Sequence, residues 1–356
     1  MKLHLVGGFL GSGKTTAIIA AAKLLAEQGE RVGVITNDQG RYLVDTAFVR
    51  SEDIPTLEVA GGCFCCHYGD YRAMIRRIDD SAHPTVLFAE SVGSCADLVA
   101  TVLRPSELEE NWPIESFSVF ADIRLLRLMI DGKPLPFSDE VVYLFTKQLE
   151  EAGLIILNKA DLLSKLDGES VLEGAVARFP GKPIRLQSSL RKEEVAAWLQ
   201  SLEGARTRRI PALDLDYDTY AAAEARLAWY DADLTVSPGS GSASDLLRGF
   251  LSLLREHIHR AGYSIGHVKL LASSNGKSAK LSLTAGGSDE EASFPDLGTG
   301  ILRLLINARV ECPSGELREL IHSGLREVSQ GRGREFSVQR EETIQSGYPK
   351  PVHRIL

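Results

Sequence analysis

The chain has 356 residues, of which 44% are hydrophobic and 25% are charged, and its formal net charge at pH 7 is −8. This composition is ordinary for a globular protein, and the length suggests about two domains. The acidic balance disfavours general nucleic-acid binding, which needs a surplus of Lys and Arg to neutralise phosphates. No apolar run approaches the roughly 20 residues of a membrane span, and the first residues lack the apolar core of a signal peptide. We therefore expect a cytoplasmic protein with no membrane or nucleic-acid partner.

The first predicted strand is Leu3–Val6, and a helical pattern rich in Ala, Leu and Ile covers Thr16–Gln28. The segment between them is a complete phosphate-binding loop in the strand–loop–helix context that this motif requires. Its glycines let backbone N–H groups turn toward phosphate oxygens, and the helix N-terminus adds favourable dipole charge. We expect Lys14 to reach the β- and γ-phosphates and Thr15 to place its hydroxyl on Mg²⁺. The predicted nucleoside triphosphate site comprises Gly8, Gly11, Ser12, Gly13, Lys14, Thr15 and Thr16.

Strand-like and helical runs alternate over the first 200 or so residues, which predicts a mostly parallel α/β sheet with helices on both faces. Ligands of such folds bind at the carboxyl ends of the strands, so motifs that directly follow a strand are candidate site residues. The further predicted strands are Val32–Thr36, Thr56–Ala60, Thr85–Ala89, Phe117–Ala121, Leu154–Leu157 and Ile184–Leu186. The predicted helices between them include Tyr68–Asp80, Glu140–Glu151 and Lys192–Leu202.

Two polar motifs follow strands next to the phosphate-binding loop. Asn37-Asp38-Gln39-Gly40 follows the second strand, where a loop can close over the γ-phosphate and Mg²⁺. Glu90-Ser91-Val92-Gly93 follows Thr85–Ala89, where the carboxylate of Glu90 can bind a Mg²⁺ water or orient the attacking water and Gly93 can offer its N–H to the γ-phosphate. Lys14, Asp38 and Glu90 are therefore the predicted catalytic groups. Ordinary turn chemistry at strand ends is the alternative.

Three cysteines crowd into the sequence Gly61-Gly62-Cys63-Phe64-Cys65-Cys66. Thiolates select soft or borderline metals such as Zn²⁺ or Cu(I) over Mg²⁺ and Ca²⁺. Three ligands leave one tetrahedral position open, which suits metal transfer, and His67, Asp38, water or a partner can fill it. A redox pair or buried small hydrophobic residues are the alternatives.

The other two cysteines, Cys95 and Cys312, stand alone in the sequence. A disulfide scaffold would show evenly spread pairs, and a reducing compartment disfavours disulfides. We expect both residues to be buried structural cysteines.

Asn158-Lys159-Ala160-Asp161 follows the apolar strand Leu154–Leu157. An Asp in this position can accept two hydrogen bonds from the N1–H and 2-amino groups of guanine, which adenine cannot supply. Asn158 and Lys159 would stabilise the loop and stack along the base. The alternative is that Asp161 caps a following helix. In combination with the phosphate-binding loop, the motif favours GTP over ATP.

The remainder of the chain predicts a smaller α+β domain of split β-α-β topology after an irregular linker. Residues 331–356 carry no usable periodicity, and we expect domains at 1–205 and 226–330, a linker at 206–225 and a tail at 331–356. The predicted strands are Arg226–Val236, Gly266–Ala272, Ala279–Thr284 and Leu302–Cys312, and the predicted helices are Asp245–Ala261 and Ser314–Val328.

The motifs at residues 7–16, 62–66, 90–93 and 158–161 together resemble those of the CobW-type GTPases, relatives of the nickel chaperones for urease and hydrogenase. The resemblance covers roughly residues 2–190, and Asp70 and Gln148 also look like family positions. It implies slow hydrolysis of GTP with Mg²⁺, coupled to handover of Zn²⁺ or another thiophilic transition metal. It also implies a CobW-C-like domain that meets a client metalloprotein, and it allows a homodimer.

The chain departs from the family pattern in two places. Asp38-Gln39 stands where the family usually has Glu-Phe, which shortens the carboxylate by one methylene. There is no His-rich tract, and His257 and His259 lie two apart on a predicted helix and face different directions. The leading hypothesis is a GTP-dependent metallochaperone or metal-cofactor insertase. The alternatives are a GTPase activator of a corrinoid or other metalloenzyme, and a GTP-gated interaction module with a structural zinc.

Overall fold

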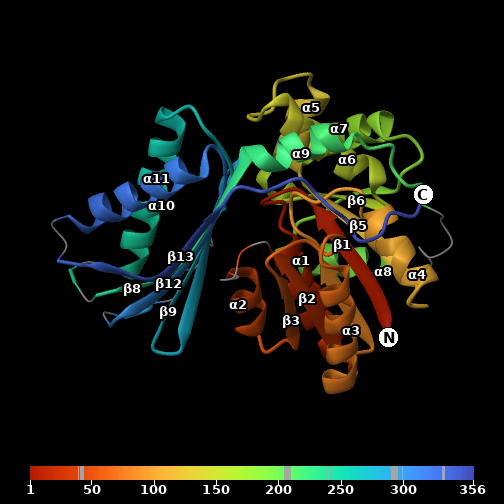
Figure 1. Ribbon diagram of the computed structural model, residues 1–356, viewed down its shortest axis with the longest axis horizontal. Helices are drawn as coiled ribbons and strands as arrows, with labels where there is room; N and C mark the ends of the chain where they lie inside the picture. Colours follow the sequence, from red (N-terminus) through yellow and green to blue (C-terminus); the bar gives the residue numbers. More distant parts are fainter. Residues whose placement is uncertain are drawn as a thin grey trace. The chain divides into compact units, whose positions relative to one another are not determined.

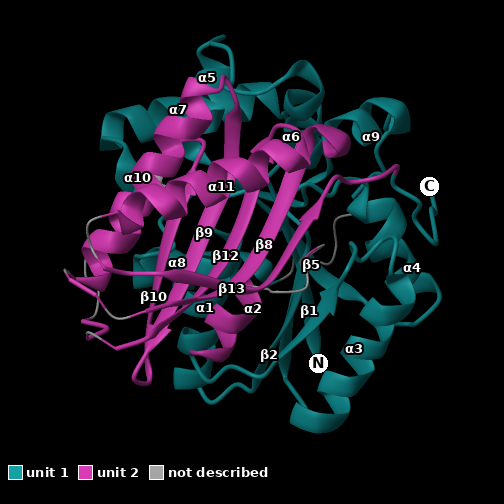
Figure 2. Ribbon diagram, turned by 60° about the vertical axis from the view of Figure 1, so that its left-hand side comes forward, with its two compact units in different colours: residues 1–39, 52–223, 349–356 teal, residues 40–51, 224–348 magenta. Residues whose placement is uncertain are grey.

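A computed structural model spans the chain and describes all residues except 39, 41–43, 204–209, 238, 241, 290–295, 299 and 331–332. The described chain falls into two compact units (Figure 2). Unit 1 comprises residues 1–39, 52–223 and 349–356, and unit 2 comprises residues 40–51 and 224–348. Each unit therefore combines segments that are far apart in the sequence. Among the described residues, no helix has both the length and the apolar character needed to cross a bilayer.

Unit 1 is built on a seven-stranded sheet with the order β3-β2-β4-β1-β5-β6-β7. Figure 1 labels β1, β2, β3, β5 and β6 of this sheet. All neighbouring strands in this sheet run parallel. The predicted mostly parallel α/β sheet is confirmed, and the predicted strands at 56–60 and 184–186 coincide with β3 and β7. The strands are β1 (Lys2–Gly8), β2 (Val32–Asp38), β3 (Thr56–Ala60), β4 (Val86–Glu90), β5 (Ile114–Asp122), β6 (Leu154–Asn158) and β7 (Ile184–Leu186).

Helices cover both faces of this sheet. α1 (Lys14–Glu27) and α8 (Lys192–Leu202) contact each other. The chain crosses the sheet in opposite directions through α1 and through α3 (Tyr68–Ala82), so right-handed crossovers put these two helices on opposite faces. The remaining helical elements are α4 (Arg104–Leu108), α5 (Ile123–Ile130), α6 (Asp139–Glu151), α7 (Lys165–Arg178), α9 (Tyr217–Arg226), the π-helical turn η1 (Val99–Leu103) and the 3₁₀ turn η2 (Ala160–Leu162).

Burial on both faces explains why the strands of unit 1 read as continuous apolar runs. Every residue of β4 and of β6 is buried. α8 adds the fully buried Trp198, whose indole N–H donates to Ser118 Oγ at 3.1 Å and whose ring contacts Phe88 and Phe120. The carboxyl ends of all seven strands meet at one edge of the sheet, which brings the polar motifs that follow them together.

Unit 2 contains a six-stranded antiparallel sheet with the order β11-β10-β9-β12-β8-β13. β12 lies between β8 and β9, and β8 lies between β12 and β13, so both β-α-β crossovers are split and the predicted topology is confirmed. Its elements are β8 (Leu227–Val236), α10 (Ala243–Arg260), β9 (Ser264–Ser274), β10 (Lys277–Thr284), β11 (Gly287–Asp289), β12 (Leu302–Glu311), α11 (Ser314–Ser329) and β13 (Phe336–Ile344).

Two elements lie where the sequence predicts irregular structure. α9 begins inside the expected linker, where the run Ala221-Ala222-Ala223 has high helix propensity. β13 lies inside the expected tail and pairs with β8 at the edge of the unit 2 sheet. Its residues are half-buried or exposed, so it lacks the apolar alternation of a core strand.

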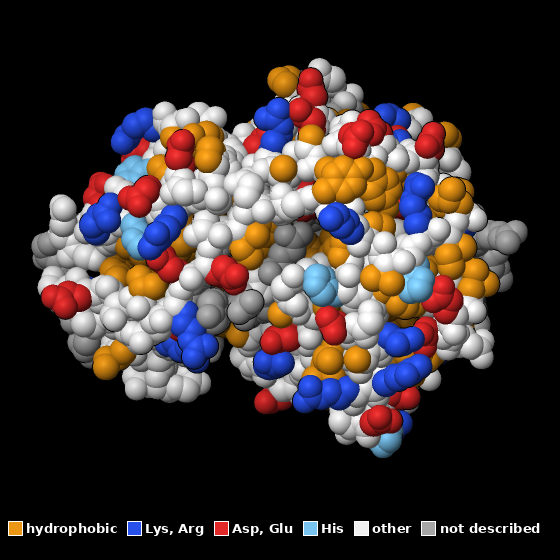
Figure 3. Space-filling view, viewed as in Figure 1, with side chains coloured by type: hydrophobic (Ala, Val, Ile, Leu, Met, Phe, Trp, Pro, Cys, Tyr) orange, Lys and Arg blue, Asp and Glu red, His pale blue; other side chains and the backbone are white. Residues whose placement is uncertain are grey.

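Unit 2 also includes α2 (Val44–Arg50), which comes after the Asn37–Gly40 motif in the chain. α2 contacts β9 and β12. Asp45 pairs with Lys269 and, at 3.4 Å, with Lys280. Burial alone would raise the pKa of Asp45, but the two ammonium groups lower it overall. α2 is thereby fixed to the sheet of unit 2. On the face in Figure 3, Lys and Arg side chains are interspersed with Asp and Glu side chains, which keeps local fields small.

Candidate functional site

The phosphate-binding loop joins β1 to α1 and depends on its glycines. Gly8, Gly11 and Gly13 have φ angles of 126°, 70° and 89°, in the region that side chains avoid. A Cβ atom at Gly8 would lie 2.1 Å from the carbonyl oxygen of Phe120, and one at Gly13 would lie 2.4 Å from Asn158 Nδ2. Both conformation and close packing therefore require glycine in this loop.

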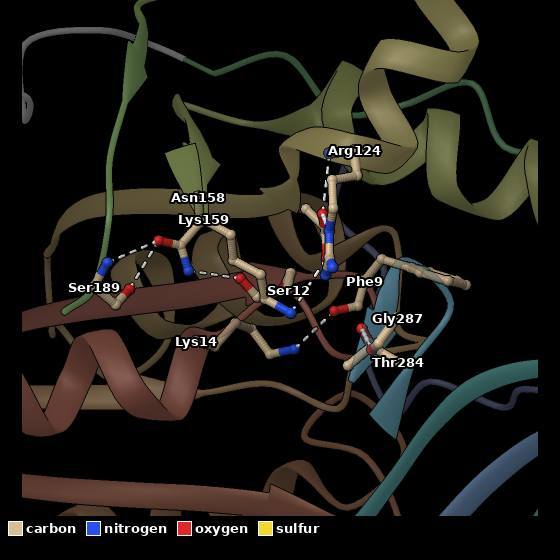
Figure 4. Close-up of polar contacts among 10 residues, drawn as sticks. Phe9, Ser12, Lys14, Arg124, Asn158, Lys159, Ser189, Thr284 and Gly287 are labelled. Carbon is tan, nitrogen blue, oxygen red and sulfur yellow. Dashed lines mark hydrogen bonds and ion pairs between the residues drawn. The ribbon is translucent and has the colours of Figure 1, made fainter. Parts of the chain in front are cut away.

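Lys14 and Thr15 begin α1 at the end of this loop. The buried Lys14 ammonium donates to the carbonyl oxygens of Gly8 at 2.8 Å and Phe9 at 3.3 Å. Figure 4 shows the contact with Phe9. Thr15 donates its hydroxyl to Glu90 Oε1 at 2.9 Å. Glu90 ends β4 opposite Val6 of β1, so the parallel pairing of these strands brings the predicted Mg²⁺ and water residues together.

Asn158 connects three loops at the carboxyl edge of the sheet. Its amide donates to the carbonyl oxygen of Ser12 at 2.8 Å, and its Oδ1 accepts from the backbone N–H and hydroxyl of Ser189 at 3.1 and 2.9 Å (Figure 4). The predicted role of Asn158 in stabilising the loop agrees with these contacts. Ser189 is a site residue that sequence reasoning missed, although it follows the predicted strand Ile184–Leu186 closely.

Lys159 lies against a carboxylate that the sequence analysis also missed. Its backbone is left-handed, with φ of 65°, and its ammonium lies 3.2 Å from Asp122 Oδ2. Asp122 ends β5 and accepts a hydrogen bond from Arg124 Nε at 2.9 Å. Burial alone would raise the pKa of Asp122, but Arg124 and Lys159 lower it overall. The signal for Asp122 was its position directly after the predicted strand Phe117–Ala121.

Asp161 is half-buried in η2 and forms no hydrogen bond that the structure records to another described residue. The alternative that it caps the following helix is wrong, because Ser164 is the N-cap of α7 and accepts from the backbone N–H of Asp167. Its carboxylate is therefore available to a ligand at the carboxyl edge of the sheet.

Asn37, at the end of β2, holds the cysteine loop. Its buried side-chain amide donates to the carbonyl oxygens of Val59 at 2.9 Å and Gly62 at 2.6 Å. The backbone N–H of Phe64 donates back to Asn37 Oδ1 at 2.9 Å. The neighbouring Asp38, a predicted catalytic and metal-binding residue, pairs through its backbone with Ala60 of β3. Its side chain lies outside the described residues.

The loop after β3 brings three thiols together. The N–H groups of Cys66 and His67 both donate to the carbonyl oxygen of Cys63, at 3.1 and 2.9 Å, which closes a tight turn. The sulfurs of Cys63 and Cys65 lie 2.8 Å apart, and those of Cys65 and Cys66 lie 3.8 Å apart. All three sulfurs lie within 4.8 Å of one another.

The three thiols of this loop have different pKa values. Hydrogen bonds from Cys65 and Cys66 hold the pKa of Cys63 well below its usual range. The same contact with Cys63 raises the pKa of Cys65, and it raises the pKa of Cys66 to about 11. The cluster thus favours a thiolate at Cys63, the form that binds metal.

Zn–S bonds of about 2.3 Å give a tetrahedral edge of roughly 3.8 Å. The Cys65 and Cys66 sulfurs have this separation, whereas the Cys63 and Cys65 sulfurs, 2.8 Å apart, would have to move apart to bind one zinc ion. His67, a candidate for the fourth ligand, is outside the group of converging ligand atoms among the described residues. Its Nδ1 packs against Gly62, where a Cβ atom would lie only 1.9 Å away.

Cys95 is buried, as the sequence predicts, and it contributes to the lowered pKa of Cys63. Gln148 fixes the backbone around it, donating to the carbonyl oxygens of Gly93 at 3.1 Å and Cys95 at 2.8 Å. Cys312 lies in the core of unit 2, as expected of a structural cysteine.

Residues 349–356 return to unit 1 and cover the cysteine loop, which the sequence did not indicate. The backbone N–H of Lys350 donates to Cys66 Sγ at 3.3 Å, and that of Val352 donates to the carbonyl oxygen of Cys65 at 2.9 Å. Arg354 Nε lies 2.8 Å from Asp97 Oδ2, two residues after Cys95. This segment therefore contacts both stretches of chain that carry the four thiols.

Comparison with known proteins agrees with this geometry. Residues 2–184 match the family model described as CobW/HypB/UreG, nucleotide-binding domain. The zinc chaperone CobW of Sinorhizobium sp is 28% identical over 222 residues, which cover 54% of this chain and 59% of that protein. The zinc chaperone YeiR of Escherichia coli (strain K12) is 29% identical over 165 residues, which cover 45% of this chain and 47% of that protein. The matched regions thus span about half the length of these relatives. Since the family model covers more than half of it, the chain belongs to the CobW/HypB/UreG family.

Proposed function

We propose that this protein is a GTP-hydrolysing metallochaperone that binds Zn²⁺, or a similar thiophilic metal, through Cys63, Cys65 and Cys66 and transfers it to a client metalloprotein. The observation that carries this proposal is the pair of hydrogen bonds that Asn37 donates to Gly62 and accepts from Phe64. They tie the strand end beside the predicted γ-phosphate loop to the loop that carries the three thiols. One residue thus links the nucleotide site to the metal site.

In the nucleotide half of the proposed cycle, Lys14 donates to the β- and γ-phosphates in place of the loop carbonyls that it now contacts. Thr15 and Glu90 lie in contact and would hold Mg²⁺ and its water, and the ion would supply charge neutralisation at the phosphates. Asp38 and Gly93 close over the γ-phosphate, and Glu90 orients the attacking water. Asp161 selects guanine while Asn158 and Lys159 support the base-binding loop.

In the metal half of the cycle, the ion is cargo. The converging thiols supply a soft donor set that Mg²⁺ and Ca²⁺ disfavour. Closure of Asp38 over the γ-phosphate changes the position of Asn37, its chain neighbour, and therefore strains or relaxes the turn at Cys63. The nucleotide state thereby sets how tightly the thiols hold the metal.

Unit 2 is the part that we propose meets the client. α2 comes after the predicted nucleotide-sensing loop in the chain, and Asp45 pairs it with Lys269 and Lys280 of the same unit. We propose that a change at the predicted switch residues reaches unit 2 along this chain connection. Client affinity would then depend on the same nucleotide state that governs metal release.

Zinc stoichiometry tests the metal half directly. We expect the protein to bind one zinc per chain, Cys65→Ser to lose that tight site, and Cys312→Ser to keep it, because Cys312 lies in the core of unit 2. Calorimetric titration on the three reduced proteins gives stoichiometry and affinity together. Tight zinc binding that survives Cys65→Ser would contradict the proposal.

The burial of Cys63 and Cys65 supports a second candidate function, a GTP-gated interaction module with a structural zinc. Structural zinc contributes to folding free energy. In that case zinc removal would lower the melting temperature sharply even without nucleotide. A metallochaperone would keep nearly the same melting temperature after a chelator removes its cargo.

A further inference from the structure

We propose that residues 349–356 form a strap that closes the metal site, so that zinc enters and leaves the three thiols only while this strap is detached. The inference rests on the proposed metal-binding role of Cys63, Cys65 and Cys66. The strap belongs to unit 1, as does the cysteine loop, although 284 residues of chain separate Lys350 from Cys66. A closed strap would retain the metal during transit, and a detached strap would allow its handover.

The first half of the strap contacts the cluster at its most accessible sulfur. Cys63 and Cys65 are 6% and 2% exposed, whereas Cys66 is half-buried, so an ion reaches the cluster most easily past Cys66. The backbone N–H of Lys350 donates to Cys66 Sγ at 3.3 Å. The N–H of Val352 donates to the carbonyl oxygen of Cys65 at 2.9 Å. The strap therefore lies across the side from which a metal ion would approach.

The sequence of the strap favours this contact. Pro349 and Pro351 have no N–H group and fix their own φ angles, and each disfavours helical backbone in the residue before it. The first half of the strap is thus biased toward extended backbone, which lowers the conformational entropy lost when it docks. Lys350 and Val352 follow the two prolines, and the N–H groups of both bind the cysteine loop.

Two side chains hold the second half of the strap. Arg354 Nε lies 2.8 Å from Oδ2 of the fully buried Asp97, and the guanidinium lies 5.1 Å from the centre of the Tyr217 ring. Such charge-assisted hydrogen bonds are about twice as strong as neutral ones. The ring of His353 packs edge-on against that of Tyr68, with ring centres 4.8 Å apart.

The end of the strap binds a backbone group that the π-helical turn η1 leaves open. The N–H of Arg104 donates to the carbonyl oxygen of Val99, five residues earlier. In the same register the partner of the Ala100 carbonyl would be Pro105, which has no N–H group. Instead, the N–H of Ile355 donates to the Ala100 oxygen at 2.9 Å. This contact fixes the position of the strap along the surface of unit 1.

The strap can detach while the rest of unit 1 stays folded. All eight of its residues are half-buried or exposed, and the side chains of Val352 and Leu356 are 57% and 74% exposed. Segments with few buried apolar contacts open at a free energy far below that of global unfolding. The attachment thus depends on a few polar contacts, and changing one of them should change how often the metal site opens.

The rate of zinc release tests this inference. The zinc-loaded protein is mixed with an excess of a chromogenic chelator, and a protein truncated after Tyr348 is compared with the full chain. Because the truncation removes the strap contacts, including the charged one to Asp97, we expect the same zinc stoichiometry and release faster by about tenfold or more. Arg354→Gln should accelerate release by a smaller factor. The matched control Arg326→Gln, on the exposed side of α11 in unit 2, should release zinc at the unmodified rate.

A peptide in trans separates a strap from a part needed only for folding. A synthetic peptide of residues 345–356, added to the truncated protein, should slow zinc release again as its concentration rises. The same peptide carrying Arg354→Gln should need a higher concentration for the same effect, because it lacks the contact with Asp97.

Equal release rates from the full and truncated proteins, each carrying one zinc, would overturn the inference while leaving the proposed function standing. If the full chain does not bind zinc through the three cysteines, the proposed function itself fails. Circular dichroism and GTP affinity show whether the truncated protein is folded. If it is not, Arg354→Gln decides, and release from this variant at the unmodified rate would overturn the inference.

Discussion

The side-chain amide of Asn37 donates to the carbonyl oxygen of Gly62 at 2.6 Å, across the parallel pair β2 and β3. Asn37 immediately precedes the predicted switch carboxylate Asp38, and Gly62 immediately precedes Cys63. The hydrogen bond therefore joins the residues that we predict to sense the nucleotide to those that we propose hold the metal. Because the side chain also binds Val59 and Phe64, the connection is rigid and not a single flexible contact.

Asn37→Ala should uncouple the two sites. Loss of these buried hydrogen bonds leaves backbone groups unpaired and should lower the free energy of unfolding by about 2 kcal/mol. Zinc binding should remain, but the ratio of zinc affinities between the GTP-analogue and GDP forms should shrink. The logarithm of this ratio should fall to less than half of its value in the unmodified protein. Asn37→Asp, which keeps the acceptor for Phe64 but loses the two donations, should give an intermediate effect. If Asn37→Ala shows full nucleotide dependence, the coupling runs through another contact.

Lys14→Ala should abolish GTP hydrolysis and leave zinc binding of the nucleotide-free protein intact. Lys14 is buried in the phosphate-binding loop, whereas Lys133 is exposed and pairs with Asp131. Lys133→Ala is therefore the matched control and should hydrolyse GTP normally. Phosphate release and zinc affinity are measured on all three proteins. Loss of both properties in Lys14→Ala would indicate unfolding, and continued hydrolysis would contradict the assigned role.

Asp161→Asn should shift nucleotide preference from GTP toward xanthosine triphosphate. Loss of the charged hydrogen bonds to guanine should weaken GTP binding by about tenfold to a hundredfold. Asp131→Asn, outside the nucleotide motifs, should leave the preference unchanged. Competition against a fluorescent GTP analogue measures each affinity. Equal competition by ATP and GTP in the unmodified protein would refute the guanine assignment.

The pH dependence of stability should contain a contribution from His4. Burial and the charge of Lys2 lower the pKa of His4 to about 4, and its Nδ1 lies 2.8 Å from Ser116 Oγ. The unfolded chain, with a pKa near 6.5, therefore binds a proton that the folded protein does not bind between pH 6.5 and 4. The free energy of unfolding is therefore unaffected by His4 above pH 6.5 and falls by about 3 kcal/mol as the pH falls from 6.5 to 4.

Denaturant unfolding of the unmodified protein and of His4→Asn, between pH 7 and 4.5, isolates this contribution. The Asn amide can keep a hydrogen bond to Ser116 but does not titrate. We expect the unmodified protein to lose more stability over this range than the variant. Parallel pH profiles for the two proteins would show that His4 does not contribute.

The parts of the fold predicted from sequence are those with strong local signals. Leu154–Leu157 is apolar because this central parallel strand is buried on both faces. α7 was missed because Gly168 and Gly174 weaken its helix propensity and its apolar residues form no clear stripe. The phosphate-binding loop, the cysteine loop and Asn158 were found because each is a short motif directly after a strand.

The remaining site residues depend on topology. Asn37 reaches Gly62 because β2 and β3 are neighbours in the sheet, and strand order cannot be read from local sequence. Lys350 contacts Cys66 across 284 residues of chain, so no local pattern could reveal it. Ser189 and Asp122 are ordinary polar residues at strand ends, and only their contacts with Asn158 and Lys159 mark them as parts of the site.

The most direct test of nucleotide-gated metal transfer is zinc affinity measured with a competing chelator in the nucleotide-free, GDP and non-hydrolysable GTP analogue forms. We expect a shift of tenfold or more between the two nucleotide forms, which equals about 1.4 kcal/mol of coupling, and an equal reciprocal effect of zinc on nucleotide affinity. Identical tight zinc affinities in all three forms would contradict nucleotide-gated metal transfer.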